Sequence, residues 1–247
     1  MRVVEPRFRP DRVDTDSREA MEAMQSEIAD AAVFNDELGL IPESIRQGDA
    51  LVAGVDQAFP GDRAVSAVVV LRGDEVVARS SAVEPQSMPY VPGLLAFREG
   101  PPIIAALESL DVEPDVVVLD GSGRIHYREA GIATHIGVCF DIPSIGVAKN
   151  LLCGQPTGPT DELVAGETVP IEADESMTAP SGTIVGRAYQ SRQFSDSKRI
   201  NPLYVSPGHR LSVATAVECL AASGGEYKLP RPIRLADQYA DELRSSL

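Results

Sequence analysis

Residues Val116–Gly123 read VVVLDGSG and carry the clearest signal of the chain's architecture. Four consecutive apolar residues are typical of a short strand that is buried on both faces of a sheet. Asp120 ends this strand, and two glycines follow it closely, so the backbone there can turn sharply and lie close to a ligand. Ligands of α/β proteins bind at the ends of such strands. The stretch alone does not decide between a functional Asp120 and one that caps the next turn.

Three other strands are expected before this one. Leu51–Asp56 is a second apolar run that ends in an aspartate, and residues 64–71 and 75–81 are two more candidate strands. Residues 72–74, between the last two, form the tight turn of a hairpin. The sheet therefore begins with three consecutive strands, most simply an antiparallel meander.

The order of the elements predicts the fold class. A helix at about 129–140 separates the Asp120 strand from a fifth strand, Ser144–Ala148, and another helical segment precedes the Asp120 strand. The order β-β-β-α-β-α-β matches the ribonuclease H-like fold, an α/β fold with a mixed sheet flanked by helices. The first and fourth strands of that fold are neighbours, so we expect Asp56 and Asp120 to face each other.

Two adjacent carboxylates at strand ends suit a divalent cation. Mg²⁺ binds oxygen ligands, and it commonly takes one or two carboxylates together with waters and substrate phosphates. Such an ion can activate water and stabilise the leaving oxygen in phosphodiester cleavage. Without a cation, two desolvated carboxylates would repel each other and one pKa would rise. The alternative is that Asp56 and Asp120 are not neighbours and that each caps a turn.

Residues 89–99, PYVPGLLAFRE, lie between these strands. Pro92 suits the first position of a helix, and the Gly-Pro-Pro sequence at 100–102 is expected to end that helix and start another. Glu99 would then sit at a break between helices, where it either reaches the cleft or remains a solvated charge. Tyr90, between two prolines, is either an exposed ring that stacks on a base or a buried ring that covers the core.

Two later segments add polar candidates. Residues 206–212, SPGHRLS, predict a helix start, with Ser206 as N-cap, Pro207 at the first position and His209 at the third. The helix dipole there favours neutral imidazole, which suits a metal site, although a surface histidine is the alternative. Lys149 directly follows a strand, so it is either a cleft lysine that contacts phosphate or an ordinary surface lysine.

The remaining segments are predicted more coarsely. Residues 16–34 form an amphipathic helix that begins with a capping box of Asp16 and Glu19. Residues 155–181 are expected to be a loop insertion with an acidic, solvated face. We find no repeat and no long linker, so residues 1–247 are predicted to form a single domain. The other expected elements are a loop at 35–50, strands at 183–189 and 203–205, and a helix at about 233–243.

The composition excludes several classes of protein. No apolar run approaches about 18 residues, so we expect no membrane span. The N-terminus lacks an apolar signal core, and Cys139, Cys153 and Cys219 are odd in number and widely spaced. We therefore expect a cytoplasmic, reduced protein with its cysteines in the core, and we expect a monomer.

The charge is strongly negative. Twenty-two basic and 37 acidic residues give a formal net charge of −15, and only three of the basic residues are lysines. Acid excess with few lysines is typical of proteins from salt-loving microbes. Such a charge disfavours nucleic-acid binding at low salt, but at molar salt charges are screened beyond about 3 Å. A nucleic-acid function is therefore not excluded.

Six sequence blocks, taken in order, resemble one known family. The set is similar to endonuclease V over about residues 50–222, which is most of the chain. The order and spacing of the blocks make the resemblance specific, since any single block would be weak. The blocks are Gly54–Asp56, residues 89–99, Asp120–Gly123 with His126, Gly131–Gly137 with His135, Ile145–Lys149 and Ser206–Ser212.

The resemblance implies a DNA repair endonuclease. Endonuclease V nicks a strand near a deaminated purine, chiefly the hypoxanthine of deoxyinosine, at the second phosphodiester bond on its 3′ side. The family requires Mg²⁺, for which Mn²⁺ is expected to substitute, and some members prefer inosine in RNA. The expected partner is therefore DNA that contains deoxyinosine or other deaminated bases, with an inosine-specific ribonuclease as the alternative.

The resemblance also assigns roles to residues of this sequence. It implies that Asp56 and Asp120 are metal ligands, and that Tyr90 is the wedge that fills the gap left by a flipped base. Backbone groups can read hypoxanthine, because its O6 accepts and its N1–H donates, the opposite of adenine. The implied catalytic residues are Asp56, Glu99, Asp120, Lys149 and His209, and the implied substrate-binding residues are Tyr90, Pro92, Gly93, Leu95, Gly121, His126, Gly131 and Ile132.

Some features stay open or depart from the family. His126 either contacts substrate or orients a group of the site, and His135 is expected to make a structural hydrogen bond. Tyr127 stands where the family usually has proline, and residues 57–59 are off the commonest pattern. The rival functions are another nuclease of the same fold, such as the nuclease half of the nucleotide-excision machinery, and a catalytically idle nucleic-acid or inosine binder. The wedge tyrosine argues against the first rival, and the retained acids argue against the second.

Overall fold

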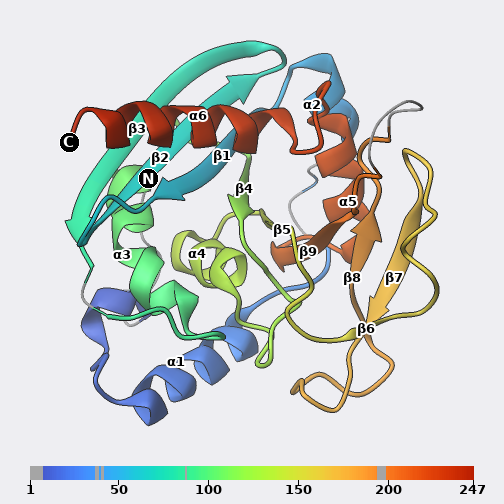
Figure 1. Cartoon of the computed structure of the whole chain (residues 1–247), viewed down its shortest axis with the longest axis horizontal. Helices are drawn as coiled ribbons and strands as arrows, with labels where there is room; N and C mark the ends of the chain where they lie inside the picture. The colour runs from blue at the N-terminus through green and yellow to red at the C-terminus, as the bar shows by residue number, and fades with distance from the viewer. Residues whose placement is uncertain (1–7, 37–38, 40–41, 87, 194–198) are drawn as a thin grey trace.

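The strands form one mixed sheet with helices on its faces (Figure 1). The computed structural model describes residues 8–36, 39, 42–86, 88–193 and 199–247, and within them the strand order is β3-β2-β1-β4-β5-β9-β8-β7-β6. The strands are β1 Leu51–Ala58, β2 Arg63–Arg72, β3 Glu75–Pro85, β4 Val116–Asp120, β5 Ser144–Ala148, β6 Gln155–Pro156, β7 Thr168–Glu172, β8 Ile184–Tyr189 and β9 Leu203–His209. The helices are η2 Pro10–Arg12, α1 Arg18–Ala31, α2 Pro42–Gln47, α3 Leu95–Glu108, α4 Ile132–Phe140, α5 Val213–Ala222 and α6 Arg231–Ser245.

The centre of the sheet places the two strand-end aspartates side by side. β1 pairs antiparallel with β2 and parallel with β4, and β4 pairs parallel with β5. Val55 lies beside Leu119, so Asp56 and Asp120 are the next residues along two neighbouring strands. This confirms the mixed α/β sheet, the opening meander and the adjacency of the first and fourth strands that the sequence predicted.

Helices cover both faces of the sheet, because its central strands are apolar on both sides. Val55 belongs to the core under α3 and α4, whereas Val52 belongs to the core under α5 and the start of α6. α6 lies directly on β1 (Figure 1), since a Cβ atom on Gly54 would be only 2.1 Å from the carbonyl oxygen of Pro232. A glycine at this position therefore lets α6 approach the strand that carries Asp56.

The prediction of two helices separated by a Gly-Pro-Pro break is wrong. α3 runs through Pro101 and Pro102 without a break, although an interior proline costs a helix about 3 kcal/mol. The apolar face of the helix offsets this cost, because Ile104 and Leu107 are fully buried in the core beneath it. Glu99 consequently lies inside a helix and is only 8% exposed, rather than standing at a solvated break.

The predicted helix start at Ser206 is also wrong. Ser206, Pro207 and His209 lie in β9, and α5 begins later, with Ser212 as its N-cap accepting from the Thr215 N–H at 3.2 Å. Pro207 is tolerated in the strand because the register of pairing with β5 shifts at this point. His209 is therefore a strand residue, and the argument from the helix dipole does not apply to it.

Residues 155–181 are more than a loop insertion. They add β6 and β7 to the edge of the sheet, and Ile171 and Met177 join a small core beside β8. The acids Glu162 and Glu175 on this segment are exposed, as predicted. The segment therefore combines an acidic outer side with a packed inner side.

Two other boundaries differ from the sequence prediction. The cap of α1 is Ser17, whose side chain accepts from the Ala20 N–H, rather than Asp16, and residues 42–47 form α2 instead of loop. The three cysteines are free and buried, as predicted. Every helix in the described ranges is too short or too polar to span a membrane. Residues 1–7, in which no signal core was expected, lie outside the described ranges.

Candidate active site at the ends of β1 and β4

Four carboxylates and one lysine meet in a cavity of about 240 Å³. Asp56 and Asp120 come from the ends of β1 and β4, and Glu99 comes from the buried face of α3. Asp237 is contributed by α6, which lies on β1, and Lys149 directly follows β5. Five elements that are far apart in the sequence therefore line one small space at the carboxyl ends of the parallel strands.

Hydrogen bonds fix several of these groups. Lys149 Nζ donates to Asp120 Oδ2 at 2.7 Å, which joins the ends of two neighbouring strands. The backbone N–H of Gln57 donates to Asp56 Oδ1 at 2.8 Å, and its side-chain amide donates to the carbonyl oxygen of Glu99 at 3.1 Å. Gln57 therefore ties the end of β1 to the helix that carries Glu99.

The carboxylates are poorly compensated by positive charge. Burial raises the pKa of Asp56 to about 7, and the charges of Asp120 and Asp237 act in the same direction. Burial also raises the pKa of Glu99 to about 7, against the opposing charge of Arg98. Carboxyl groups with pKa values near neutrality, gathered in a cavity, are typical of functional sites.

The donor set fits a hard divalent cation. Among the described residues, no three His, Cys, Asp or Glu side chains are already arranged as a metal site. Mg²⁺ needs less than this, because it commonly binds one or two carboxylates and completes its shell with waters and phosphate oxygens. The cavity offers oxygen donors only, and a bound cation would relieve the repulsion that raises the pKa of Asp56. Asp56 and Asp120 could therefore hold such an ion.

Sequence reasoning missed Asp237. The helix that carries it was predicted, but its polar composition gave no reason to single out one of its acids. The signal is the apolar stripe of α6, in which Ile233, Ala236 and Ala240 are buried at helical spacing. Asp237 lies next to this stripe, so its side chain is at the edge of the contact with β1.

The structure does not place His209 in this cavity. His209 pairs with Ser144 at the start of β5, whereas Asp120 pairs with Val147 near the end of that strand. His209 Nδ1 accepts the Val33 N–H at 3.1 Å, and Nε2 bonds to Asp141 Oδ1 at 3.1 Å. The prediction that His209 lines the catalytic site is therefore wrong, because the residue lies in a strand that runs away from that end of the sheet.

A second cavity of about 340 Å³ adjoins the first, and Asp120 and Lys149 line both. Seven of the eight residues expected to contact substrate line this second cavity, and Pro92 is not among its lining residues in the described structure. Gly121 needs to be glycine, because its φ is +149° and a Cβ atom there would lie 2.5 Å from Ile132. The seven are Tyr90, Gly93, Leu95, Gly121, His126, Gly131 and Ile132.

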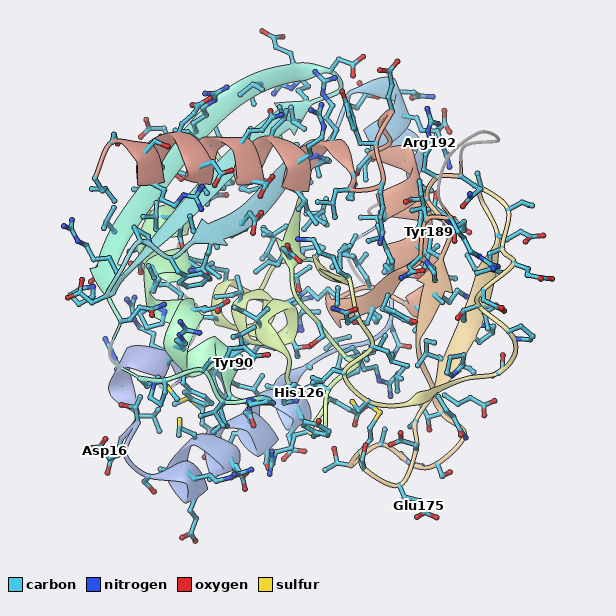
Figure 2. All side chains as sticks on the ribbon, in the orientation of Figure 1. Asp16, Tyr90, His126, Glu175, Tyr189 and Arg192 are labelled. Carbon is cyan, nitrogen blue, oxygen red and sulfur yellow. The ribbon has the colours of Figure 1, made fainter. Side chains whose placement is uncertain are left out.

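Tyr90 is 61% exposed at the edge of this second cavity. Figure 2 shows its side chain near His126, in the region above α1. The guanidinium carbon of Arg98 lies 5.9 Å from the centre of the Tyr90 ring and 4.9 Å from that of Phe59. The ring is thus exposed, and the alternative of a buried ring that covers the core is excluded.

The two remaining histidines are buried. His135 Nε2 bonds to the carbonyl oxygen of Phe8 at 2.6 Å, which confirms the expected structural hydrogen bond. His126 Nε2 bonds to the carbonyl oxygen of Gly93 at 3.0 Å, so of its two expected roles the structure supports orienting a group of the cavity wall. Burial lowers the pKa of both imidazoles to about 4.

The family profile and the most similar relatives described here carry the same description. The sequence profile of the Endonuclease V family matches residues 37–238. A protein named Endonuclease V from Natronomonas pharaonis is 67% identical over 245 residues, which cover 99% of this chain and 98% of the relative. Those from Halobacterium salinarum and Haloarcula marismortui are 53% and 51% identical, covering 98% and 99% of this chain and 100% and 98% of each relative. These three sources are halophilic archaea, in agreement with the acidic, lysine-poor composition.

Solved structures give the same result. Endonuclease V from Streptomyces avermitilis superposes with a TM-score of 0.78 at 35% identity, over 93% of this chain and 94% of that one. The catalytic domain of human Endonuclease V gives 0.81 at 30% identity, over 94% and 98% of the two chains. Endonuclease V from Ciona intestinalis, in complex with a 24mer DNA containing an inosine followed by a ribo-adenosine, gives 0.72 at 26% identity, over 92% and 97%. The sheet described above is thus the ribonuclease H-like fold of this group.

Proposed function

Because the chain belongs to the endonuclease V family, we propose that it is a Mg²⁺-dependent endonuclease that nicks DNA at deoxyinosine. The observation that carries this proposal is the pair of adjoining cavities. One is lined by four carboxylates and the other by glycines, apolar residues and a few uncharged polar residues, and Asp120 and Lys149 belong to both. A base held in the second cavity would therefore leave its own strand close to the acids of the first.

The cut is proposed at the second phosphodiester bond on the 3′ side of the lesion. Asp56, Glu99 and Asp237 line the acidic cavity, away from the cavity proposed for the base. If the flipped base lies in one cavity and the reacting phosphate in the other, the cleaved bond cannot be the one directly beside the lesion. This arrangement supports cleavage at a bond beyond the lesion rather than removal of the base.

Tyr90 and the second cavity supply the recognition step of the proposal. Base flipping requires a few kcal/mol for unstacking, which a wedge in the vacated gap can offset. Tyr90 is exposed at the edge of the second cavity, and the guanidinium carbon of Arg98 lies 5.9 Å from the centre of its ring, so the ring is open to an incoming strand. The narrow glycine-rich wall, which includes Gly121, then lets backbone groups approach the flipped base.

The acidic cavity supplies the chemistry. Asp56 and Asp120 are proposed to hold Mg²⁺, or Mn²⁺ in its place, and a bound ion of this kind acidifies water and stabilises charge on phosphate oxygens. Lys149 Nζ, which bonds to Asp120, is placed to contact the phosphate as a point charge. Glu99, with a pKa of about 7, is suited to accept a proton from the attacking water. Asp237 completes the acidic wall.

A strand-cleavage assay tests the proposal. Labelled DNA with one deoxyinosine, and the same strand with deoxyadenosine, are incubated at high KCl with Mg²⁺, with Mn²⁺ or with EDTA. We expect one nick per lesion, one bond beyond the adjacent 3′ bond, with either metal and none with EDTA. Absence of a metal-dependent nick at deoxyinosine would rule the proposal out.

An inosine-specific ribonuclease is the second candidate. The Ciona intestinalis relative was solved with an inosine that is followed by a ribo-adenosine, which places a 2′-hydroxyl beside the lesion in that complex. Three matched strands separate the candidates: all-DNA, all-RNA, and DNA with one ribonucleotide after the inosine. Faster cleavage of the two ribonucleotide-containing strands than of all-DNA would favour the second candidate.

A further inference from the structure

The segment between α5 and α6, residues 224–230, lies on the opposite face of the sheet from the cavity proposed for the base. Ala96 of α3 and Ile132 of α4 line that cavity, and both belong to the core under these two helices. Leu229 instead packs in the core under α5 and α6. The acidic cavity takes side chains from both α3 and α6, so it lies between the two faces.

Lys228 in this segment is close to the lysine of the proposed active site. Ser191 Oγ donates to the carbonyl oxygen of Lys228 at 2.6 Å, which holds the segment against the residues that follow β8. β8 runs parallel to β5, because both strands pair antiparallel with β9, so its end lies at the same edge of the sheet as Lys149. Burial and the charge of Lys149 both lower the pKa of Lys228. Lys228 therefore extends the positive charge of Lys149 onto the α6 side of the acidic cavity.

Tyr227 carries an exposed ring beside this lysine. The residue is 56% exposed, and the guanidinium carbon of Arg234, in the first turn of α6, lies 4.3 Å from the centre of the ring. This distance is that of a cation–π contact. Neither Arg234 nor Lys228 is paired with a carboxylate in the described ranges. The segment thus combines an open aromatic ring with two cations that an anionic ligand can contact.

Tyr227 and Arg234 also line a cavity of about 510 Å³. A cavity of this size can hold a nucleotide. Two other arginines of this cavity are already paired, Arg231 with Asp74 at 3.6 Å and Arg46 with Glu43 at 3.0 Å. Arg234 is therefore the arginine of this cavity that is open to a phosphate. The charged lining residues are Arg46, Arg231, Arg234, Asp74 and Glu226.

We propose that Tyr227, Lys228 and Arg234 bind the part of the substrate strand on the 3′ side of the cut. This inference rests on the proposed function, in which the base lies on the α3 and α4 side and the reacting phosphate, further in the 3′ direction, lies in the acidic cavity. The strand beyond that phosphate then continues onto the α6 side. Lys228 and Arg234 contact its phosphates, and a base stacks on the exposed part of the Tyr227 ring.

This combination of side chains suits an acidic protein at high salt. At molar salt charges are screened beyond about 3 Å, so only cations in direct contact with a phosphate contribute. Stacking involves no net charge, and it accepts any base because every base has a π face. The three side chains therefore supply affinity that does not depend on base sequence, next to a site that reads the lesion.

The test uses single strands with one deoxyinosine and different lengths beyond the cut. They carry either about two or about ten nucleotides on the 3′ side of the cleaved bond, the longer extension being within the usual site size of a single-strand binding surface. A third strand carries the extension on its 5′ side instead. Binding is measured by fluorescence anisotropy in an Asp120→Asn background, which lacks one proposed metal ligand and should not cleave.

The ring variants test stacking. Without further changes, the Asp120→Asn protein should bind the strand with the long 3′ side more tightly than the short one. Tyr227→Ala should bind the long strand about tenfold more weakly, the effect of one lost base stack, and the short strand unchanged. Tyr227→Phe keeps the ring and should bind both strands as before.

Two charge variants provide a matched comparison. Lys228→Gln and Arg244→Gln each remove one positive charge, and Arg244 lies in the last turn of α6, where it pairs with Asp241 at 3.0 Å. For the long strand, Lys228→Gln should reduce the slope of log affinity against log salt by about 0.7, the value of one phosphate contact on a single strand. Arg244→Gln should leave this slope unchanged.

Several results would overturn the inference. These are equal losses on the short and the long strand in Tyr227→Ala, a loss confined to the strand with the 5′ extension, and equal salt slopes in the two charge variants. Each would leave the proposed function intact, because that function requires only the nick at deoxyinosine. A wild-type protein that makes no such nick would contradict the proposed function, whatever the effect of strand length.

Discussion

Two polar clusters lie at opposite ends of the same parallel strands and differ in how far their carboxylates are compensated by positive charge. At the carboxyl ends, Asp56 and Glu99 have pKa values raised to about 7, and one lysine faces four acids. At the amino end of β5, Asp141 accepts from Arg210 at 2.6 Å and from His209 at 3.1 Å. Burial raises the pKa of Asp141, but these hydrogen bonds outweigh it and hold the pKa below its usual value.

The difference separates a cluster of carboxylates that lack compensating charge from a carboxylate that is fully paired. A charge that has its full set of partners stabilises the fold and leaves nothing for a ligand to contact. A buried charge without a compensating partner is typical of a functional site, where a bound cation or substrate supplies the missing positive charge. The degree of compensation, more than the residue type, therefore distinguishes the two ends of the strands and supports the proposed active site.

The largest expected effect comes from removing one acid from each cluster. Asp120→Ala should lower the nicking rate at deoxyinosine by about 10³-fold or more, because one proposed metal ligand and the partner of Lys149 are lost. Asp141→Ala should leave the rate within about threefold at a temperature where the variant is folded, while its midpoint of thermal unfolding falls. Equal losses of activity in the two variants would show that the active end has been misidentified.

A second pair of variants tests whether Asp237, rather than His209, belongs to the proposed active site. Asp237→Asn should slow nicking by about 10- to 100-fold, the range seen when groups around a metal site are changed. His209→Gln should retain nicking but lower the free energy of unfolding by about 1–3 kcal/mol, since the Val33 N–H and Asp141 lose a partner. Single-turnover rates and thermal unfolding of both variants measure this. Slow nicking by His209→Gln together with normal nicking by Asp237→Asn would show that His209, and not Asp237, contributes to the reaction.

A smaller effect is expected from the wedge. Tyr90→Ala should weaken binding of the deoxyinosine strand by about tenfold, because stacking on an aromatic ring contributes about 1–3 kcal/mol per base. Tyr90→Phe keeps the ring and should bind nearly as wild type. Anisotropy titrations of both variants in the Asp120→Asn background give the comparison. Loss of binding in Tyr90→Phe as well would mean that the hydroxyl group, not stacking, is the source of affinity.

The smallest expected effect is the change with pH in the free energy of unfolding of the metal-free protein. Asp56 and Glu99 have folded-state pKa values above their usual ones, so between about pH 4 and 7 the folded state binds more protons than the unfolded state. Stability contributed at this end should therefore decrease as pH rises from about 4 through 7. Scanning calorimetry in EDTA should show the midpoint of thermal unfolding falling by about 2–4 °C for each kcal/mol of stability lost. Addition of Mg²⁺ should raise this midpoint more at pH 8 than at pH 5.

The comparison also shows which features the sequence predicts. The adjacency of Asp56 and Asp120 follows from strand order, since an apolar run fixes each strand and the topology fixes their neighbours. Glu99 reaches the cavity although its local structure was wrongly predicted, because burial of one face of α3 outweighs the two prolines that follow it. Seven of the eight residues that the resemblance implies as substrate-binding line one cavity in the described structure.

The errors have a common physical origin. The segment at Ser206 has the local pattern of a helix start, but pairing with β5 draws it into the sheet, and His209 moves with it to the other end of the strands. Asp237 was overlooked because its role depends on how α6 crosses β1, and no local pattern reports that crossing. Both cases concern tertiary contacts that override or go beyond local sequence preference.

The close packing of α6 on β1 at Gly54 has a consequence for the order in which the protein folds during synthesis. The chain leaves the ribosome from its N-terminus, so β1, β4 and β5 can pair before residues 231–245 appear. At that stage the acidic cavity has three of its carboxylates and lies open on the side that α6 later covers. The cavity would thus gain its fourth carboxylate, Asp237, only when α6 docks on β1.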